Sequence, residues 1–375
     1  MENNTQLKEM IRSMVIDILQ GQKQETASSQ PVKQVSRGQE PGVFDTVDEA
    51  IRAAKEAQLR FEDCTLATRE KVIADIRTAM RPRVQELAQK TVEETGMGRV
   101  ADKVLKLNLT LDKTPGVEDL VTECETGDNG MTLYELSAYG VIGAVTPSTN
   151  PAETLICNTI GMLAAGNAVF FSVHPGAKHL SRLLVSELNQ IIAKSIGIEN
   201  LIVTLREPSI ECAQEMMLHP DVSLLVVTGG PGVVKQALQS GKKVIGAGAG
   251  NPPAFVDETA DIKKAAQDIV LGASLDNNIL CIAEKSVVAM RQIEPQLVQE
   301  MVKVGCVLVD NQQDIQRLVD LTVLPNGTPN KQFVGKNASV ILDAAHIPYN
   351  GDPRLIILRT PKDHPFAVIE MLMPI

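Results

Sequence analysis

The chain has 375 residues, which suggests two or three domains at about 150 residues each. Hydrophobic residues make up 44% and charged residues 22%, which excludes a wholly disordered or fibrous protein. The net charge of −10, with no long basic run, argues against nucleic acid as a partner. No apolar run reaches the roughly 18 residues of a membrane-spanning helix, so we expect no membrane partner.

Six cysteines lie far apart along the chain with no Cys-x-x-Cys pair: Cys64, Cys124, Cys157, Cys212, Cys281 and Cys306. This spacing argues against a disulfide framework and against a thiolate metal site. The five histidines are equally scattered, so we predict no metal. The N-terminus lacks the basic and apolar pattern of a secretory signal, and the expected location is cytoplasmic.

Residues 1–20 predict an amphipathic helix, because apolar residues recur at helical spacing before Gly21. The apolar stripe comprises Leu7, Met10, Ile11, Met14, Val15, Ile18 and Leu19. Residues 21–42 are polar and contain Pro31 and Pro41, which predicts a flexible linker. A helix this short must dock to persist, either on its own domain or, as the linker favours, on a separate partner.

Helical patterns follow over Asp48–Phe61, Leu66–Thr95 and Arg99–Leu111. Gly96 and Gly98 are the predicted C-caps of the second helix. Residues 121–139 then change character. They predict a β-hairpin, because its turn at residues 128–130 has the sequence Asp-Asn-Gly, whose members tolerate positive φ.

Residues 139–245 alternate short apolar runs with helical stretches. The predicted strands are Gly140–Thr146, Ala168–Val173, Leu201–Leu205, Ser223–Val227 and Lys243–Ile245. The predicted helices between them are Pro151–Ala164, Ala177–Ser195, Ser209–Leu218 and Val233–Gln239. This alternation indicates an α/β fold with a Rossmann-type parallel sheet. Such sheets bind ligands at the carboxyl ends of their strands, so we expect cofactor contacts from the loops after Val173 and Val227.

Two glycine-rich segments follow predicted strands. Thr228–Gly232 opens a helix whose free amide groups suit a dinucleotide pyrophosphate, although such a sequence also marks ordinary strand-to-helix turns. Residues 246–253 superficially resemble a G-x-G-x-x-G fingerprint, but two prolines and an extended stretch take the place of the helix. We interpret this second segment as a close-approach loop beside the site.

Cys281 follows a polar segment at residues 276–278, Asp-Asn-Asn. A free cysteine is usually a small buried hydrophobe, and Cys157 and Cys306 lie in apolar runs that fit this description. By composition alone Cys281 fits this description too, but the polar residues before it set it apart from those two, so we also consider it as a nucleophile. Such a thiol must ionise with the help of backbone dipoles or a cofactor cation.

At these residues the sequence resembles the aldehyde dehydrogenase superfamily, and within it the CoA-acylating branch that includes the propionaldehyde and acetaldehyde dehydrogenases of bacterial microcompartments. The matching segments are Gly140–Pro151, Thr228–Gly232, Gly250–Pro253, Asn277–Cys281 and Glu370–Pro374. The resemblance implies a dinucleotide-binding domain at 43–120 and 139–245, an oligomerisation hairpin at 121–138 and a catalytic domain at 246–375. It implies oxidation of a short-chain aldehyde, propionaldehyde before acetaldehyde, to acyl-CoA with NAD.

The resemblance also assigns roles to single residues. Cys281 matches the cysteine that attacks the aldehyde, and Asn150 matches the asparagine whose amide holds the oxyanion, a contact worth roughly 3 to 4 kcal/mol. Glu370 matches the glutamate that contacts the nicotinamide ribose. The residues expected to bind the cofactor are Thr146, Pro147, Ser148, His174, Pro175, Gly176, Thr228, Gly229, Gly230, Gly248 and Glu370.

One departure from the family pattern points to the acyl acceptor. Hydrolytic members carry a glutamate in an E-L-G-G-K-N-P segment that activates water, and alignment on Asn251 and Pro252 puts Gly246 at its position. A missing base slows water attack about a hundredfold or more, whereas a thiolate needs less help. Coenzyme A is therefore the expected acceptor, and the small residues 246–250 leave room for its pantetheine arm.

A second departure concerns the dinucleotide. Hydrolytic members have K-x-x-E after the second strand, where this chain has His-Pro-Gly-Ala at residues 174–177. Without the glutamate, NADP is not excluded, and Lys178 leaves the choice open. We expect NAD because it is the usual cofactor of the branch.

Both ends of the chain carry further expectations from the resemblance. The N-terminal helix and linker resemble encapsulation peptides, which implies a shell protein as partner and the microcompartment lumen as location. Family members continue past the Glu370 segment and add a strand that pairs with the hairpin of a neighbouring subunit, so a full-length chain is expected to form a homo-oligomer. A chain that stops at Ile375 would leave the hairpin edge exposed and assembly impaired.

Three alternatives stay open. A hydrolytic enzyme would not need CoA. A reductase for glutamate semialdehyde or an acyl phosphate would need arginines near Cys281, and the sequence shows none there. A catalytically impaired cargo or assembly module would not turn over aldehyde at all.

Overall fold

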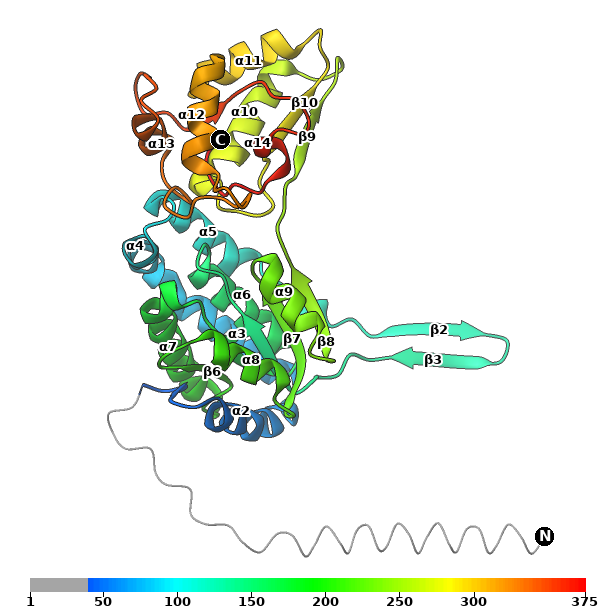
Figure 1. Ribbon diagram of the computed structural model, residues 1–375. Helices are drawn as coiled ribbons and strands as arrows, with labels where there is room; N and C mark the ends of the chain where they lie inside the picture. Colours follow the sequence, from blue (N-terminus) through cyan, green and yellow to red (C-terminus); the bar gives the residue numbers. More distant parts are fainter. Residues whose placement is uncertain (1–39) are drawn as a thin grey trace, which may run out of the picture. The chain divides into compact units, whose positions relative to one another are not determined.

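The computed structural model describes residues 40–375, which form one compact unit. The predicted N-terminal helix and most of the predicted linker lie outside the described residues. Within residues 40–375, no helix is both long and apolar enough to cross a membrane. The description below follows the labels of Figure 1.

A six-stranded parallel sheet organises residues 40–247 (Figure 1). Its strands are β1 (Val43–Phe44), β4 (Val141–Val145), β5 (Ala168–Ser172), β6 (Ile202–Leu205), β7 (Val222–Thr228) and β8 (Lys243–Ala247), in the order β1-β6-β5-β4-β7-β8. Every neighbouring pair is parallel, which confirms the predicted Rossmann-type sheet. The sequence did not predict β1, because its two residues pair only with the distant β6.

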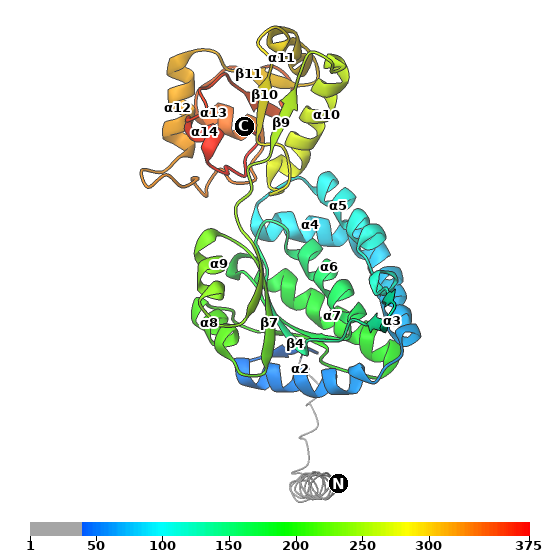
Figure 2. The same cartoon turned by 90° about the vertical axis from the view of Figure 1, so that its right-hand side faces the viewer.

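Helices cover both faces of this sheet (Figure 2). They are α2 (Val47–Glu62), α3 (Leu66–Met80), α4 (Val84–Thr95), α5 (Val100–Lys113), α6 (Pro151–Ala164), α7 (Lys178–Ile196), α8 (Ile210–Leu218) and α9 (Pro231–Leu238). Short 3-10 turns occur at η1 (Arg81–Arg83), η2 (Val117–Asp119) and η3 (Pro175–Ala177). Helices α6 and α7 contact each other on one face, while α2 and α8 contact each other on the opposite face.

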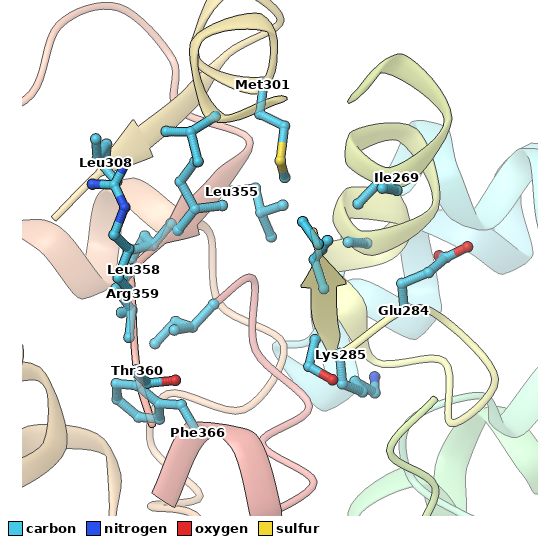
Figure 3. Close-up of a pocket in the computed structure, with 18 of the residues that line it drawn as sticks. Ile269, Glu284, Lys285, Met301, Leu308, Leu355, Leu358, Arg359, Thr360 and Phe366 are labelled. Atoms are coloured by element: carbon cyan, nitrogen blue, oxygen red, sulfur yellow. The ribbon is translucent and has the colours of Figure 1, made fainter. Parts of the chain in front are cut away.

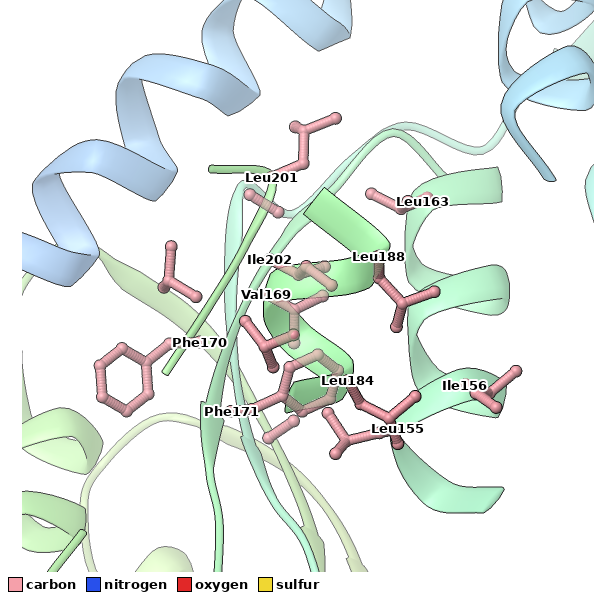
Figure 4. Close-up of a cluster of buried hydrophobic side chains, with 14 of the residues drawn as sticks. Leu155, Ile156, Leu163, Val169, Phe170, Phe171, Leu184, Leu188, Leu201 and Ile202 are labelled. Carbon is pink, nitrogen blue, oxygen red and sulfur yellow. The ribbon is translucent and has the colours of Figure 1, made fainter. Parts of the chain in front are cut away.

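The core of the sheet follows from strand alternation (Figure 4). Phe170 and Phe171 are neighbours on β5, so their rings point to opposite faces, and both are buried. The ring of Phe171 lies among Leu155 of α6 and Leu184 and Leu188 of α7. This packing fixes the helices against the strands and therefore fixes the loops at the strand ends.

Two predictions in the helical region are wrong in detail. The stretch Leu66–Thr95 is not one helix, because Pro82 lacks an amide hydrogen and the chain breaks into α3, η1 and α4. Gly96 is the C-cap of α4, with φ of 66°. Gly98 is not a cap, since it lies in the turn before α5, where a side chain would collide with the carboxylate of Asp276.

The predicted hairpin is confirmed as β2 (Glu123–Gly127) and β3 (Gly130–Tyr134), which pair antiparallel. Of the three turn residues, Gly130 has a positive φ of 133°. All residues of both strands are exposed. The two faces of the hairpin are therefore not buried by the described part of this chain.

Residues 248–375 contain two small parallel pairs of strands. β9 (Pro253–Val256) pairs with β10 (Ser286–Ala289), and β11 (Cys306–Leu308) pairs with β12 (Leu355–Ile357). The helices are α10 (Ile262–Ser274), α11 (Glu294–Lys303), α12 (Gln312–Thr322), α13 (Ala338–Ala344) and α14 (Pro365–Val368), with a 3-10 turn η4 at Leu275–Asn278. Strand β9 confirms the extended stretch predicted after the two prolines, while the domain boundaries at 120, 138 and 245 stay predictions.

Candidate active site

The predicted cofactor residues gather at one edge of the large sheet. Strands β5, β4, β7 and β8 are consecutive neighbours, and all run parallel. At their carboxyl ends, the loop after β4 begins near Thr146 and the loop after β5 near Val173. The loop after β7 begins near Gly229 and the loop after β8 near Gly248. The topology thus brings together residues that are about 100 positions apart in sequence. Glu370 alone comes from a different element, the segment after α14.

Several local features of this edge suit a dinucleotide. Thr146 is buried, and its hydroxyl has no hydrogen-bond partner among the described residues. Gly230 is the N-cap of α9 and supplies no side chain to the free amides of that helix. An added Cβ at Gly230 or Gly248 would meet nothing within 4 Å, so the backbone is open to close approach. These features fit a phosphate group at a helix N-terminus.

Strand β5 ends just before residues 174–177, where this sequence lacks the K-x-x-E pattern of hydrolytic members. His174 is exposed, and its Nδ1 accepts a hydrogen bond of 3.0 Å from the amide of Gly176. Lys178 forms an ion pair of 2.6 Å with Glu207. No carboxylate from residues 174–177 is present to read a ribose.

Asn150 lies at the start of α6, beyond the end of β4. It is half-buried and occupies the N-cap position, but its side chain does not cap the helix. Its Oδ1 accepts a hydrogen bond from Nζ of Lys106, and its Nδ2 donates to Oγ1 of Thr149 at 3.2 Å. The amide is therefore held through its oxygen while its nitrogen keeps a hydrogen for another acceptor.

The turn before Cys281 has an unusual backbone. Asp276, Asn277 and Asn278 have φ of 50°, 56° and 62°, three consecutive residues in the left-handed region. Asp and Asn tolerate this region better than most residues because their short side chains bond to nearby backbone. Here Asn278 Nδ2 donates to the carbonyls of Ala273 and Glu284, at 2.7 and 2.9 Å. The polar segment that marked Cys281 in the sequence thus builds the turn that presents it.

Cys281 is half-buried at the end of this turn. A side chain at Gly250 would collide with the carbonyl group of Cys281, so the loop after β8 passes directly beside the cysteine. This confirms the close-approach interpretation of residues 246–253. Cys281 is not walled off in apolar packing, in contrast to Cys306, whose pKa burial raises to about 12.

Lys285 was not predicted and lies in the same turn. Its Nζ donates to the carbonyls of Asn278 and Leu280, both at 2.8 Å. Burial lowers its pKa to about 8, and the negative charges of Glu370, Cys281 and Glu284 oppose this shift. The charge of Lys285 thus acts on both Cys281 and Glu370. In the sequence, only the position of Lys285, four residues after Cys281, indicates a role at the site.

A buried charge cluster behind the turn was also missed. Asp276 Oδ2 accepts from Lys103 at 3.0 Å and from Lys106 at 2.5 Å, and Lys106 also contacts Glu153 at 3.2 Å. All four residues are buried. The sequence did contain a signal, since the two lysines share the inward face of α5 with Leu107, where apolar residues are expected.

The two lysines of this cluster differ in their pKa. Burial lowers the pKa of Lys103, and repulsion from Lys106 adds to this effect. Burial also acts to lower the pKa of Lys106, but attraction to Glu153 and Asp276 outweighs it, so the pKa of Lys106 is raised. Lys106 therefore stays charged beside the amide of Asn150.

A cavity of about 330 Å³ lies between the two small strand pairs (Figure 3). Its wall includes Lys285, Leu355, Thr360 and Phe366. None of the predicted catalytic or cofactor residues lines it. We therefore place the candidate site at the sheet edge and the cysteine turn, not in this cavity.

Comparison with known proteins identifies the family. The aldehyde dehydrogenase family profile matches residues 20–315. The chain belongs to the aldehyde dehydrogenase family. Within residues 40–375, no three His, Cys, Asp or Glu side chains are grouped so as to hold a metal ion.

Several similar proteins are named as acylating enzymes. The CoA-propanoylating propanal dehydrogenase of Salmonella typhimurium is 47% identical over 373 residues, covering 99% of this chain and 78% of the relative. A Rhodopseudomonas palustris propionaldehyde dehydrogenase structure with bound CoA and an acylated cysteine has a TM-score of 0.86 and 47% identity, covering 89% of this chain and 76% of that chain. A propionaldehyde dehydrogenase structure from the fucose utilisation microcompartment of Clostridium phytofermentans gives the same TM-score of 0.86 and identity of 47%, with coverages of 89% and 77%.

Lys285 generates a prediction about thiol reactivity. A positive charge near a thiol favours the thiolate, so Lys285→Met is expected to slow iodoacetamide alkylation of Cys281 at pH 7 by about three- to tenfold. Lys285 is charged below its pKa of about 8, so the difference should be present at pH 7 and fade as the pH rises through 8. Peptide mapping by mass spectrometry measures the rate at each cysteine.

Lys264→Met, at an exposed lysine, is the matched control and should alkylate like the wild type. Cys306 should stay unreactive in all variants. Equal alkylation rates of Cys281 in the wild type and Lys285→Met at pH 7 would contradict the role of Lys285 in thiol reactivity. A slower rate in Lys285→Met that persists unchanged above pH 8 would contradict it too.

Proposed function

We propose that the chain oxidises a short-chain aldehyde to the corresponding acyl-CoA while reducing a nicotinamide dinucleotide, with propionaldehyde as the favoured substrate and acetaldehyde next. The observation that carries the proposal is a half-buried cysteine that lies directly beside Gly250, in the loop that follows strand β8. On that strand, Gly246 stands where alignment places the base of hydrolytic members. The acylating activities named for the relatives support it.

In the proposed reaction, Sγ of Cys281 attacks the aldehyde carbon and forms a carbon–sulfur bond. The carbonyl oxygen gains negative charge and accepts a hydrogen bond from Nδ2 of Asn150. The dinucleotide, when bound, accepts the hydride that leaves this carbon. A thioester on Cys281 remains, and the thiolate of CoA displaces Cys281 from it, which releases acyl-CoA and restores the thiol after proton uptake.

The roles of the remaining site residues are part of the same proposal. Thr146, Pro147 and Ser148 would line the nicotinamide half of the cofactor site, and Thr228, Gly229, Gly230 and Gly248 would surround the pyrophosphate. His174, Pro175 and Gly176 would border the adenosine half. Glu370, which is attracted by the charge of Lys285, would contact the nicotinamide ribose.

NAD is the proposed cofactor, with NADP as the second choice. A relative that is 47% identical, an engineered glycolyl-CoA reductase, was solved with bound NADP+. In this chain Lys178 directly follows the predicted ribose loop at residues 174–177, and it forms an ion pair with Glu207. This pairing favours NAD, because a free cation there would suit the additional phosphate of NADP.

The arginines near the cysteine turn bear on one alternative, a reductase for glutamate semialdehyde or an acyl phosphate. Arg99 and Arg354 are the arginines tied to the cysteine turn and its neighbours. Arg99 donates to Asn277 at 3.0 Å and pairs with Asp352, and Arg354 pairs with Asp102. Nε and one terminal nitrogen of Arg99, and the guanidinium of Arg354, thus bind within the protein, and the other terminal nitrogen of Arg99 is buried without a partner among the described residues. A carboxylate or phosphate clamp needs arginines that face the substrate.

We also propose that residues 1–20 dock on a microcompartment shell protein, which would place the enzyme in the compartment lumen, and that the full protein is a homo-oligomer. The microcompartment origin of a relative supports the location. The hairpin, exposed on both faces, supports a role in subunit contacts.

The first prediction concerns the acyl acceptor. We expect NADH formation from propionaldehyde to depend strictly on CoA over many turnovers, because Gly246 stands where hydrolytic members place the base that activates water. NADH absorbance with and without CoA measures this dependence. Turnover without CoA would favour the hydrolytic alternative, and no NADH under either condition would favour the assembly module.

The second prediction uses position 246. Gly246 is exposed on β8, and a Cβ there would lie 3.1 Å from Cγ1 of Val234, a contact that a small side-chain shift relieves. Gly246→Glu restores a carboxylate and is expected to raise release of free acid by about tenfold or more. Gly246→Gln has the same shape without the base and is the matched control. No gain for Gly246→Glu over Gly246→Gln, with NADH formation intact in both, would count against the proposed acyl transfer.

The third prediction concerns the N-terminal segment. Removal of residues 1–20 should leave kcat and KM unchanged, because the catalytic residues lie in residues 40–375, and should abolish co-purification with assembled shells. Unchanged packaging of the shortened protein would refute the docking proposal.

A further inference from the structure

The amide of Asn150 is held by one cation. Lys106 Nζ donates to Asn150 Oδ1, and the same ammonium contacts Asp276 at 2.5 Å and Glu153 at 3.2 Å. The two carboxylates lie on η4 and α6, respectively, while Lys106 comes from α5. Three elements therefore meet at one ammonium group.

This contact decides which way the amide faces. An Asn side chain can bind in two orientations related by a flip, and the orientation with a cation on its nitrogen would be repulsive. With Lys106 on Oδ1, Nδ2 must point to the other side. One hydrogen of Nδ2 donates to Thr149 Oγ1 at 3.2 Å, and the second is available to a ligand.

We infer that Lys106 is a positioning residue for the reaction, which orients and polarises the Asn150 amide so that its nitrogen donates to the oxyanion formed at Cys281. The inference rests on the proposed oxyanion role of Asn150. A hydrogen bond from a cation to the oxygen of an amide withdraws electron density and strengthens donation by its nitrogen. Such a donor is effective only when its direction is fixed before the charge develops.

The same ammonium connects the amide to the nucleophile. Asp276, five residues before Cys281, begins the left-handed turn, and its Oδ2 accepts from Lys106. The other oxygen of Asp276 accepts from the amide of Arg99 at 2.8 Å. Lys106 therefore fixes the donor and one end of the cysteine turn relative to each other.

Lys103 provides a matched comparison. It is buried on the same helix and contacts the same oxygen of Asp276, at 3.0 Å. Its other bond is to the backbone carbonyl of Thr149, at 3.2 Å, and not to the side chain of Asn150. Loss of Lys103 removes a buried cation just as loss of Lys106 does, but leaves the contact on the amide in place.

The test is a double-mutant cycle on the acylation step. Single-turnover NADH formation from propionaldehyde, measured without CoA, reports this step for the wild type, Lys106→Met, Asn150→Ala and the double variant. We expect Asn150→Ala to slow acylation by about a hundredfold or more and Lys106→Met by about ten- to a hundredfold. In the Asn150→Ala background, Lys106→Met should cost no more than Lys103→Met costs there, because the amide is gone and only the contact with Asp276 remains to be lost.

Lys103→Met is measured in the wild-type and Asn150→Ala backgrounds and should slow acylation by the same factor in both. If Lys106→Met proves too unstable to purify, Lys106→Gln keeps a donor to Asn150 without the charge, and the same cycle applies to it. If Lys106→Met slows acylation by the same factor with and without Asn150→Ala, the inference is overturned while the role of Asn150 is kept. Unimpaired acylation in Asn150→Ala would overturn the proposed role of Asn150 and the inference together.

Discussion

The candidate site depends on the buried ion pairs of the Asp276 carboxylate with Lys103 and Lys106. Its Oδ2 accepts from the ammonium groups of Lys103 and Lys106, its Oδ1 accepts from the amide of Arg99, and its own amide donates to Asp102 at 2.9 Å. The group is fully buried, so removal of either lysine would leave Asp276 and Glu153 with a single cation to compensate them in a low dielectric. The cluster thereby fixes a strained turn that the local sequence alone would not hold.

The parallel sheet supplies the second constraint. Because its strands all run in one direction, the loops after β4, β5 and β7 emerge at the same edge. Asn150 belongs to the first of these loops and starts α6. The buried cluster then ties this loop to the turn that carries Cys281, so the proposed cofactor edge and the proposed nucleophile are held by one continuous set of contacts.

Much of this could be predicted from the sequence, since strand and helix periodicity is local. The strands around Phe170 and the turn at Gly230 follow from patterns within a few residues. Lys106 has a local signal, its place on the inward face of α5, but its partner Asn150 lies 44 residues away and does not follow from that signal. Lys285 could not be found, because its contact with the carbonyl of Leu280 exists only in the folded turn. A single helix at 66–95 was predicted because its apolar spacing continues across the break at Pro82, where the missing amide hydrogen ends α3.

The most direct test of the chemistry is the site of acylation. The protein is incubated with propionaldehyde and NAD in the absence of CoA, digested, and mapped by mass spectrometry for a propionyl thioester. We predict a single adduct on Cys281 that disappears when CoA is added and is replaced by propionyl-CoA. An adduct on another cysteine, or NADH formation with Cys281 unmodified throughout, would contradict the assignment of Cys281 as the nucleophile.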